Sequence, residues 1–263
     1  MKGVLLAGGT GSRVMPLTAV TNKHLLPIFD KPMIYYPLHN LIRAGIKDIF
    51  VVTGGEHFDS VGRLLGSGKL LEDVLGIASD SINSIAYGVQ DRAGGIAEAL
   101  GLAREFVGDD NVTVMLGDNI YGQEDFLSRA VKNFAYGAHL FLKEVPDENL
   151  YEETDKGRRA KYGIAELDKL EHVLGIEEKP VNPKTNFAVT GAYIYDNDVF
   201  NVIPNLKRSA RGELEITDVN NHYIEIAEAG SSVVTDFWTD AGSIETLHRA
   251  GVLVAEKRGY FNF

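Results

Sequence analysis

Residues 4–13, VLLAGGTGSR, decide how the chain begins to fold. The apolar residues 4–7 predict a buried strand, and the closely spaced glycines after them end it. Glycine has no Cβ, so backbone N–H groups in such a turn can come close to an anion. Arg13 and Lys23 add the positive charge that a polyphosphate requires. The stretch therefore predicts a phosphate-binding loop, with an ordinary glycine turn as the alternative.

Two better-known phosphate loops do not match this stretch. A P-loop needs Lys-Ser or Lys-Thr at a fixed spacing after its glycines, and the chain has neither pair there. A dinucleotide fingerprint needs a third glycine where Val14 stands, and Pro16 interrupts the helix that should follow. An NAD-binding dehydrogenase is therefore a weaker hypothesis than a protein that binds a nucleoside triphosphate.

The composition limits the possible classes of protein. With 263 residues and 44% hydrophobic content, the chain can bury a large core as one α/β domain. It has no cysteine, which excludes disulfides, thiolate metal sites and a cysteine nucleophile. Its net charge of −11 disfavours nucleic acid and anionic membranes as partners. We find no signal peptide or membrane span, and we expect a cytoplasmic protein.

Apolar runs alternate with helical patterns through the first half. The expected strands cover 2–7, 48–53, 85–89 and 112–116, and the expected helices cover 33–44, 58–65 and 96–106. This alternation predicts an α/β fold with a Rossmann-like, mostly parallel sheet flanked by helices. Ligands bind beyond the carboxyl ends of such strands. Gly8 and Asp118 each follow a strand, so we expect both at that edge.

The second half has shorter strands and longer connections. We expect a single domain, 1–263, with a nucleotide-binding half at 1–143 and a β-rich lobe plus C-terminal helices at 144–263. In this half the expected strands are 163–167, 173–176, 188–195 and 232–237, and the expected helices are 215–229 and 243–257. The charged segment 147–161 predicts an exposed loop, and the sequence assigns no function to it.

Several motifs together resemble the sugar-1-phosphate nucleotidylyltransferases. They occur in that family's order over nearly the whole chain, at 5–13, 21–27, 30–38, 90–99, 116–119, 177–180, 189–191, 211–220 and 238–242. The chain is most similar to members that act on glucose 1-phosphate with dTTP. The resemblance implies the family's nucleotide-diphospho-sugar transferase fold, with its sugar pocket in the β-rich lobe. It also implies a short form, without the further C-terminal helices of longer members.

The function that the resemblance implies is transfer of deoxythymidylyl from dTTP to α-D-glucose 1-phosphate. The products are dTDP-glucose and pyrophosphate, and the reaction opens dTDP-deoxysugar synthesis, including the dTDP-rhamnose route. The resemblance also implies Mg²⁺ as cofactor and a homo-oligomer, a tetramer or a dimer. UTP or another hexose or amino-sugar 1-phosphate stays open as the substrate. A non-catalytic nucleotide-sugar sensor is the alternative from a different class.

The chemistry of this reaction selects the candidate catalytic residues. The attacking phosphate oxygen is already ionised, so alignment, charge neutralisation and a metal ion are needed in place of a general base. Mg²⁺ prefers carboxylate and phosphate oxygens. Judged by composition alone, an aspartate in a loop is more often a cap or turn residue than a metal ligand. The resemblance, by contrast, implies that Asp118 and Asp240 are the metal ligands. Arg13 and Lys23 complete the catalytic set, and their joint presence with the aspartates counts against a sensor.

The remaining site residues follow from the same motifs. The nucleotide-binding candidates are Leu6, Gly8, Gly9, Gly11, Ser12, Arg13, Lys23, Gln90, Gly95 and Asp118. The candidates for binding the sugar phosphate are Asn119, Tyr162, Gly163, Glu178, Lys179, Thr190, Gly191 and Arg211. Gln90 carries a donor and an acceptor and can pair with a pyrimidine imide edge. The family has proline after this glutamine and the chain has Asp91, which leaves the choice between thymine and uracil open.

Overall fold

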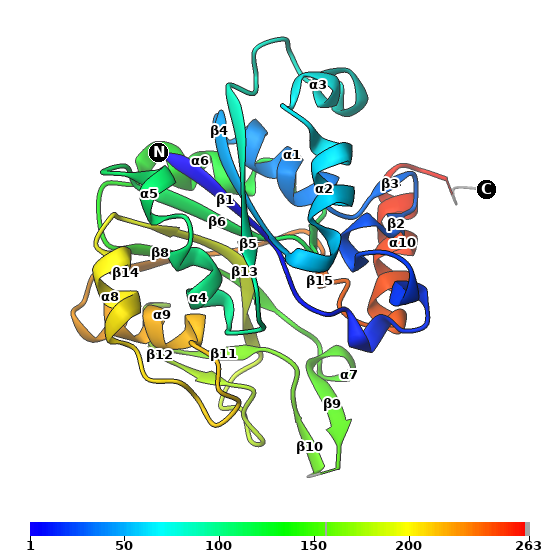
Figure 1. Cartoon of the computed structure of the whole chain (residues 1–263). Helices are drawn as coiled ribbons and strands as arrows, with labels where there is room; N and C mark the ends of the chain where they lie inside the picture. Colours follow the sequence, from blue (N-terminus) through cyan, green and yellow to red (C-terminus); the bar gives the residue numbers. More distant parts are fainter. Residues whose placement is uncertain (156, 261–263) are drawn as a thin grey trace.

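The computed structural model describes residues 1–155 and 157–260 and centres on a nine-stranded sheet (Figure 1). The strand order is β12-β11-β13-β6-β1-β4-β5, and β13 also pairs with β8, which carries β14. Neighbours among β5, β4, β1 and β6 run parallel, whereas β13 is antiparallel to β6. The predicted α/β fold with a mostly parallel, mixed sheet is confirmed.

The elements have the following bounds. The strands of the main sheet are β1 (Lys2–Ala7), β4 (Asp48–Gly54), β5 (Ser84–Gln90), β6 (Val112–Leu116), β8 (Ala138–Glu144), β11 (Gly163–Leu167), β12 (Val173–Glu178), β13 (Phe187–Tyr195) and β14 (Ala229–Val233). Three small ladders join β2 (Pro27–Ile28) to β3 (Lys31–Pro32), β7 (Asn119–Tyr121) to β15 (Trp238–Asp240), and β9 (Tyr151–Thr154) to β10 (Gly157–Ala160). The helices are α1 (Tyr35–Arg43), α2 (Phe58–Leu65), α3 (Lys69–Leu75), α4 (Ile96–Gly101), α5 (Arg104–Val107), α6 (Phe126–Asn133), α7 (Asp147–Leu150), α8 (Val199–Val202), α9 (Ile216–Glu225) and α10 (Ile244–Lys257).

Hydrophobic clusters cover both faces of the sheet. Successive residues of β1 alternate between them: Leu5 packs into the cluster that α1, α2 and α6 share, and Leu6 into the cluster of α4, α8 and α9. Burial on both faces explains why this strand is a continuous apolar run. Each fully buried leucine stabilises the fold by roughly 2 kcal/mol.

Helix α10 fixes the segment that carries Asp240. The Ser243 side chain caps the helix by accepting a hydrogen bond from the Thr246 N–H, and the Thr246 hydroxyl accepts one from the Ser243 N–H. Val254 of this helix packs in a cluster with Ile120 of β7.

Among the described residues, no helix combines the length and apolar character needed to cross a bilayer.

Most predicted elements exist, with two changes at their bounds. The expected helix at 96–106 is divided into α4 and α5, with a break at 102–103. The expected strand at 232–237 is shifted, because residues 229–233 form β14 beside β8 and the chain then turns into β15. The helices expected at 215–229 and 243–257 correspond to α9 and α10.

The prediction of an exposed loop at 147–161 is wrong. The segment forms the short helix α7 and then an antiparallel hairpin of β9 and β10. Its charges stabilise the strands, because Glu152 lies directly opposite Arg159 and their side chains form an ion pair at 2.9 Å. The guanidinium of Arg158 also lies 3.8 Å from the ring centre of Tyr151.

Candidate active site

The glycine loop follows β1 directly. Gly9 and Gly11 have φ angles of 97° and 62°, in the left-handed region that residues with a Cβ rarely adopt. A Cβ on Gly11 would also lie 2.9 Å from Cγ2 of Thr18. The chain continues in a short 3₁₀ helix, Ser12–Val14, which carries Arg13. These two positions therefore need glycine to form the loop.

The glycine loop and Asp118 share one edge of the sheet, as predicted. Strands β1 and β6 are parallel neighbours in which Leu6 pairs with Leu116. Just beyond this pair, the N–H of Gly117 donates to the carbonyl of Leu6 at 2.8 Å. The two strands therefore end at the same level, and the loops that follow them start side by side.

The β7–β15 ladder brings Asp118 and Asp240 together. Asn119 of β7 is the cross-strand partner of Asp240, and the Ala241 N–H donates to the Asp118 carbonyl at 2.7 Å. Burial raises the pKa of Asp240, and the nearby Asp118 carboxylate raises it further. A pair of carboxylates that repel each other in this way is suited to a cation between them.

Arg13 reaches the same place because position 242 is glycine. A Cβ on Gly242 would lie 2.9 Å from a guanidinium nitrogen of Arg13 and 2.7 Å from Oδ2 of Asp240. The Tyr162 hydroxyl donates to Oδ1 of Asp240 at 3.1 Å. The Arg13 guanidinium thus lies next to the second carboxylate.

Lys23 and Asp118 form a largely buried ion pair. Their Nζ and Oδ2 atoms are 2.5 Å apart, and the two side chains are 13% and 15% exposed. Burial by itself raises the pKa of Asp118, but the Lys23 ammonium and hydrogen bonds from Lys23 and Asn119 hold it well below its usual range. Asp118 is therefore ionised at neutral pH.

His24 is buried beside this ion pair, where a positive charge on its ring is disfavoured. Its Nδ1 lies 2.8 Å from Oδ1 of Asn22, and a Cβ on Gly117 would lie 2.7 Å from its Cδ2. Burial, reinforced by the Lys23 charge, lowers the pKa of His24 to about 3. The imidazole is therefore a neutral packing group between the Lys23 turn and the end of β6.

The buried His24 should make stability fall with acidification. The unfolded chain takes up a proton near pH 6.5 and the folded protein does so near pH 3, so acidification between these values favours unfolding. By pH 5 this difference amounts to about 2 kcal/mol. In His24→Gln, the drop in unfolding free energy between pH 7.5 and 5 should be smaller by that amount in urea titrations. The exposed His248→Gln is the control, and equal drops in wild type and His24→Gln would contradict the account.

A cavity of about 420 Å³ opens over the two carboxylates. Arg13, Lys161 and Lys179 line it, and none of these three forms an ion pair within the described part of the chain. The other predicted residues on its wall are Asp118, Asn119, Tyr162, Gly163, Glu178, Gly191 and Asp240. The cavity therefore contains a carboxylate pair, cations without a carboxylate partner, and hydrogen-bonding groups. These are the groups that a phosphorylated sugar needs in its binding site.

Two residues predicted to bind the sugar phosphate do not line this cavity. Thr190 is fully buried, because alternate residues of β13 face opposite ways and Gly191 takes the cavity side. Arg211 is engaged outside the cavity, where its guanidinium contacts Glu178, Glu213 and Glu215 at 3.4, 3.5 and 2.8 Å.

Gln90, predicted to contact the base of a nucleotide, lies over the glycine loop. A Cβ on Gly8 would be 3.3 Å from Oε1 of Gln90, and Nε2 of Gln90 donates to the Gly95 carbonyl at 3.2 Å. Gly95 has a φ of 102°, and a Cβ there would lie 2.3 Å from the Leu214 carbonyl oxygen. The backbone thus holds Gln90 beside the loop.

Gln90→Ala should weaken nucleotide binding and change the chemical step little. Loss of the amide removes a donor and an acceptor for the pyrimidine, which corresponds to about a tenfold rise in KM for the nucleotide. Steady-state kinetics measure KM and kcat separately, with the exposed Asp109→Ala as control. An unchanged KM would show that Gln90 does not contact the base.

The structure adds cavity residues that the sequence analysis missed. They are Glu152, Lys161, Val189, Tyr193, Ile216, Thr217, Asn220, Trp238, Glu245 and Thr246, with others. Thr217, Asn220 and Trp238 lie inside motifs already recognised, so their motifs were the available signal. Glu152 and Lys161 lie in the charged segment, where nothing in the sequence marked them.

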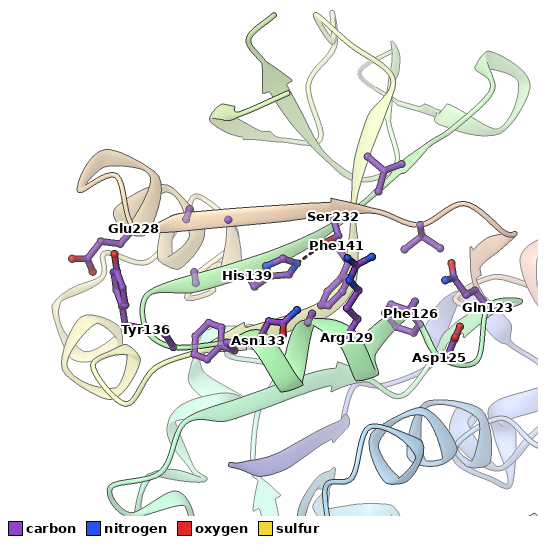
Figure 2. A pocket seen from close by; sticks show the side chains of 18 of the residues that line it. Gln123, Asp125, Phe126, Arg129, Asn133, Tyr136, His139, Phe141, Glu228 and Ser232 are labelled. Atoms are coloured by element: carbon purple, nitrogen blue, oxygen red, sulfur yellow. Dashed lines mark hydrogen bonds between the residues drawn. The ribbon is translucent and has the colours of Figure 1, made fainter. Parts of the chain in front are cut away.

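Size alone does not identify the active site. A hollow of about 700 Å³ lies between α6 and β14, where Arg129, His139 and Ser232 line it (Figure 2). His139 and Ser232 are hydrogen-bonded there at 2.8 Å. None of the predicted site residues lines this hollow. The smaller cavity at the sheet edge is therefore the candidate site.

The donor set at the edge fits a magnesium ion bound together with its substrate. Within the described residues, no group of three or more His, Asp or Glu side chains is placed to hold a metal on its own. Mg²⁺ commonly takes one or two carboxylates and completes its shell with phosphate oxygens and water. Asp118 and Asp240 supply two carboxylates at the cavity wall.

A parallel-centred sheet with a glycine loop, a carboxylate pair and cations at one edge has the groups that a nucleotide-dependent transferase needs. The chain belongs to the nucleotidyl transferase family, whose sequence profile matches residues 2–257.

Glucose-1-phosphate thymidylyltransferases are among its relatives. The protein from Neisseria meningitidis is 41% identical over 259 residues, which cover 97% of this chain and 82% of the relative. The protein from Mycobacterium tuberculosis is 39% identical over 252 residues, covering 94% and 80%. A structure from Bacillus anthracis, assigned as a glucose-1-phosphate thymidylyltransferase and solved with a sucrose, is 44% identical with a TM-score of 0.82 and covers 96% of this chain and 94% of that one. UDP-glucose pyrophosphorylase, at 23% identity and TM-score 0.82, has the same fold and covers 98% and 99%.

Proposed function

We propose that this protein transfers deoxythymidylyl from dTTP to α-D-glucose 1-phosphate, forming dTDP-glucose and pyrophosphate. The observation that carries the proposal is that Asp118 and Asp240 meet beside the glycine loop, in the same cavity as Glu178 and Lys179. The choice of substrates is supported by relatives that are glucose-1-phosphate thymidylyltransferases and that match nearly the whole chain.

The protein's own groups hold and align the two anionic substrates. The loop N–H groups and Arg13 bind the triphosphate, and Lys179 binds the phosphate of the sugar. The attacking oxygen on that phosphate is ionised, so no side chain has to remove a proton. The Arg13 guanidinium neutralises charge on the α-phosphate and on the departing pyrophosphate.

Asp118 and Asp240 would hold Mg²⁺ when substrates bind. Bound there, the ion supplies positive charge to the phosphate oxygens during the displacement. The ion pair with Lys23 keeps Asp118 ionised before the ion binds.

Pyrophosphate release with glucose 1-phosphate tests this function. We expect release that requires Mg²⁺ and prefers dTTP over UTP. A preference for UTP would keep the fold and the chemistry but change the nucleotide. Release with neither nucleotide would contradict the proposed function and favour the sensor.

A homo-oligomer and a cytoplasmic location stay predictions. Light scattering after size exclusion would measure the oligomeric state.

A further inference from the structure

The charged hairpin that the sequence analysis left without a function forms an arm at the active site. We call the two strands β9 (Tyr151–Thr154) and β10 (Gly157–Ala160) the arm; Figure 1 shows them projecting from the body of the protein next to α7. The arm is anchored on both sides, since Leu150, which precedes it, and Ala160, its last residue, are buried at 1% and 0% exposure. One of its side chains, that of Glu152, lines the cavity described above.

Backbone hydrogen bonds tie the arm to the turn that carries Lys179. The Ala160 N–H donates to the Pro180 carbonyl at 2.8 Å, and the Lys179 N–H donates to the Tyr162 carbonyl at 3.2 Å. Lys179 has a φ of 48°, unusual for a residue with a Cβ, so these contacts on both sides hold its backbone in place. The root of the arm and the predicted lysine for the sugar phosphate therefore form one unit.

Glu152 is a carboxylate with one oxygen engaged. Its Oε1 accepts a hydrogen bond from Nε of Arg159 at 2.9 Å, and a second guanidinium nitrogen of Arg159 lies 2.9 Å from the same atom. Within the described part of the chain, Oε2 forms no hydrogen bond or ion pair. By contrast, both oxygens of Glu178 accept hydrogen bonds, one from Thr217 at 2.7 Å and one from Arg211 at 3.4 Å. Glu152 thus keeps one carboxylate oxygen without a protein donor, whereas each oxygen of Glu178 has one.

The charge balance around Glu152 indicates what it can bind. Arg159 neutralises the carboxylate, so Glu152 adds little repulsion to a phosphate held at Lys179. Burial lowers the pKa of Lys179, whereas the charges of Glu152 and Glu178 raise it, which is consistent with Glu152 lying near that ammonium. A ligand that carries hydroxyl groups next to a phosphate fits this arrangement. Its hydroxyls can donate to the neutralised carboxylate of Glu152 while its phosphate binds Lys179.

We propose that the arm is a wall of the acceptor subsite, in which Glu152 accepts hydrogen bonds from the hexose hydroxyls. Arg159 is a positioning residue, because it fixes the Glu152 carboxylate without lining the cavity itself. This inference rests on the proposed function for the identity of the acceptor, a hexose 1-phosphate.

Two ligands separate this role from a merely structural one. Glucose 1-phosphate carries the hydroxyls and the phosphate, whereas inorganic phosphate carries only the anion. Trp238 is the chain's one tryptophan and lines the cavity, so its fluorescence reports binding of either ligand without turnover. The titrations use protein saturated with Mg²⁺ and α,β-methylene dTTP, in which a carbon bridge blocks the displacement.

We expect Glu152→Ala to raise the Kd for glucose 1-phosphate at least tenfold and to change that for phosphate less than twofold. Arg159→Gln should raise the first Kd about threefold. Glu153→Ala, an exposed neighbour on the same strand that does not line the cavity, is the matched control and should change neither. An unchanged Kd for glucose 1-phosphate in Glu152→Ala, or equal loss for both ligands, would overturn the proposal.

Removal of the arm gives a second, independent test. Tyr151 and Ala160 are cross-strand partners, so an Asn-Gly turn can join them in place of residues 152–159. The shortened protein should lose glucose 1-phosphate affinity at least tenfold and keep its Kd for α,β-methylene dTTP. Retained affinity for glucose 1-phosphate would contradict the inference, even if wild-type turnover confirms the proposed function. Failure of wild type to release pyrophosphate would count against the proposed function alone, because the binding titrations do not depend on turnover.

Discussion

Asp240→Asn should lower kcat about a thousandfold without lowering the thermal midpoint of unfolding. The substitution halves the negative charge that the Asp118–Asp240 pair offers to a cation, and such electrostatic groups are worth about 10²–10³ in rate. Folding should not suffer, because the pKa of Asp240 is raised by burial and then by Asp118. An acid with a raised folded pKa costs stability as pH rises through that pKa, and asparagine removes this cost.

Coupled pyrophosphate assays and a thermal melt of the same preparation test this prediction. Asp240 is a cleaner target than Asp118, since removal of Asp118 would leave the buried Lys23 without its partner. The exposed Asp109→Asn is the matched control and should keep wild-type kcat. A kcat within tenfold of wild type in Asp240→Asn would contradict the assignment of Asp240 as a metal ligand.

Arg13→Ala should lower kcat/KM about a thousandfold as well. Arg13 lies beside Asp240 in the cavity and forms no ion pair within the described part of the chain, so its charge is available to the substrate. Loss of one preorganised cation from a phosphoryl-transfer site typically costs 10³ or more. Lys23 cannot replace it, because the Lys23 ammonium is engaged with Asp118.

Steady-state kinetics of three variants isolate the role of the guanidinium. Arg13→Lys keeps the charge but loses the two-pronged donor, so its rate should lie between those of wild type and Arg13→Ala. Arg63→Ala removes an exposed arginine from α2 and should have no effect on rate. Near-normal kcat/KM in Arg13→Ala would rule out the proposed loop chemistry.

The sheet and the position of Asp118 at its edge could be predicted from the order of residues. Strand β1 is an unbroken apolar run ended by glycines, and Asp118 follows the similar run of β6, so their common edge followed from topology. The approach of Asp240 could not be predicted from spacing, because it depends on the β7–β15 ladder, two three-residue strands far apart in the chain. Only the family resemblance joined the two carboxylates.

Other features needed the three-dimensional contacts. Strand β8 (Ala138–Glu144) has no counterpart among the predicted elements, although Leu140 and Leu142 are buried, because it lies at the boundary between the two predicted halves of the chain. Charges in the arm favoured a loop, and their pairing across the hairpin became visible only with the register known. Arg211 matched a motif, but its three carboxylate neighbours hold it outside the cavity.

The most direct test of the central claim follows the oxygen atoms of the acceptor. Glucose 1-phosphate labelled with ¹⁸O in its phosphate is incubated with the protein, dTTP and Mg²⁺, and the products are analysed by mass spectrometry. Attack of the sugar phosphate on the α-phosphorus predicts dTDP-glucose that contains all the label, together with unlabelled pyrophosphate. Label in pyrophosphate, or dTMP formed without dTDP-glucose, would contradict nucleotidyl transfer at this site.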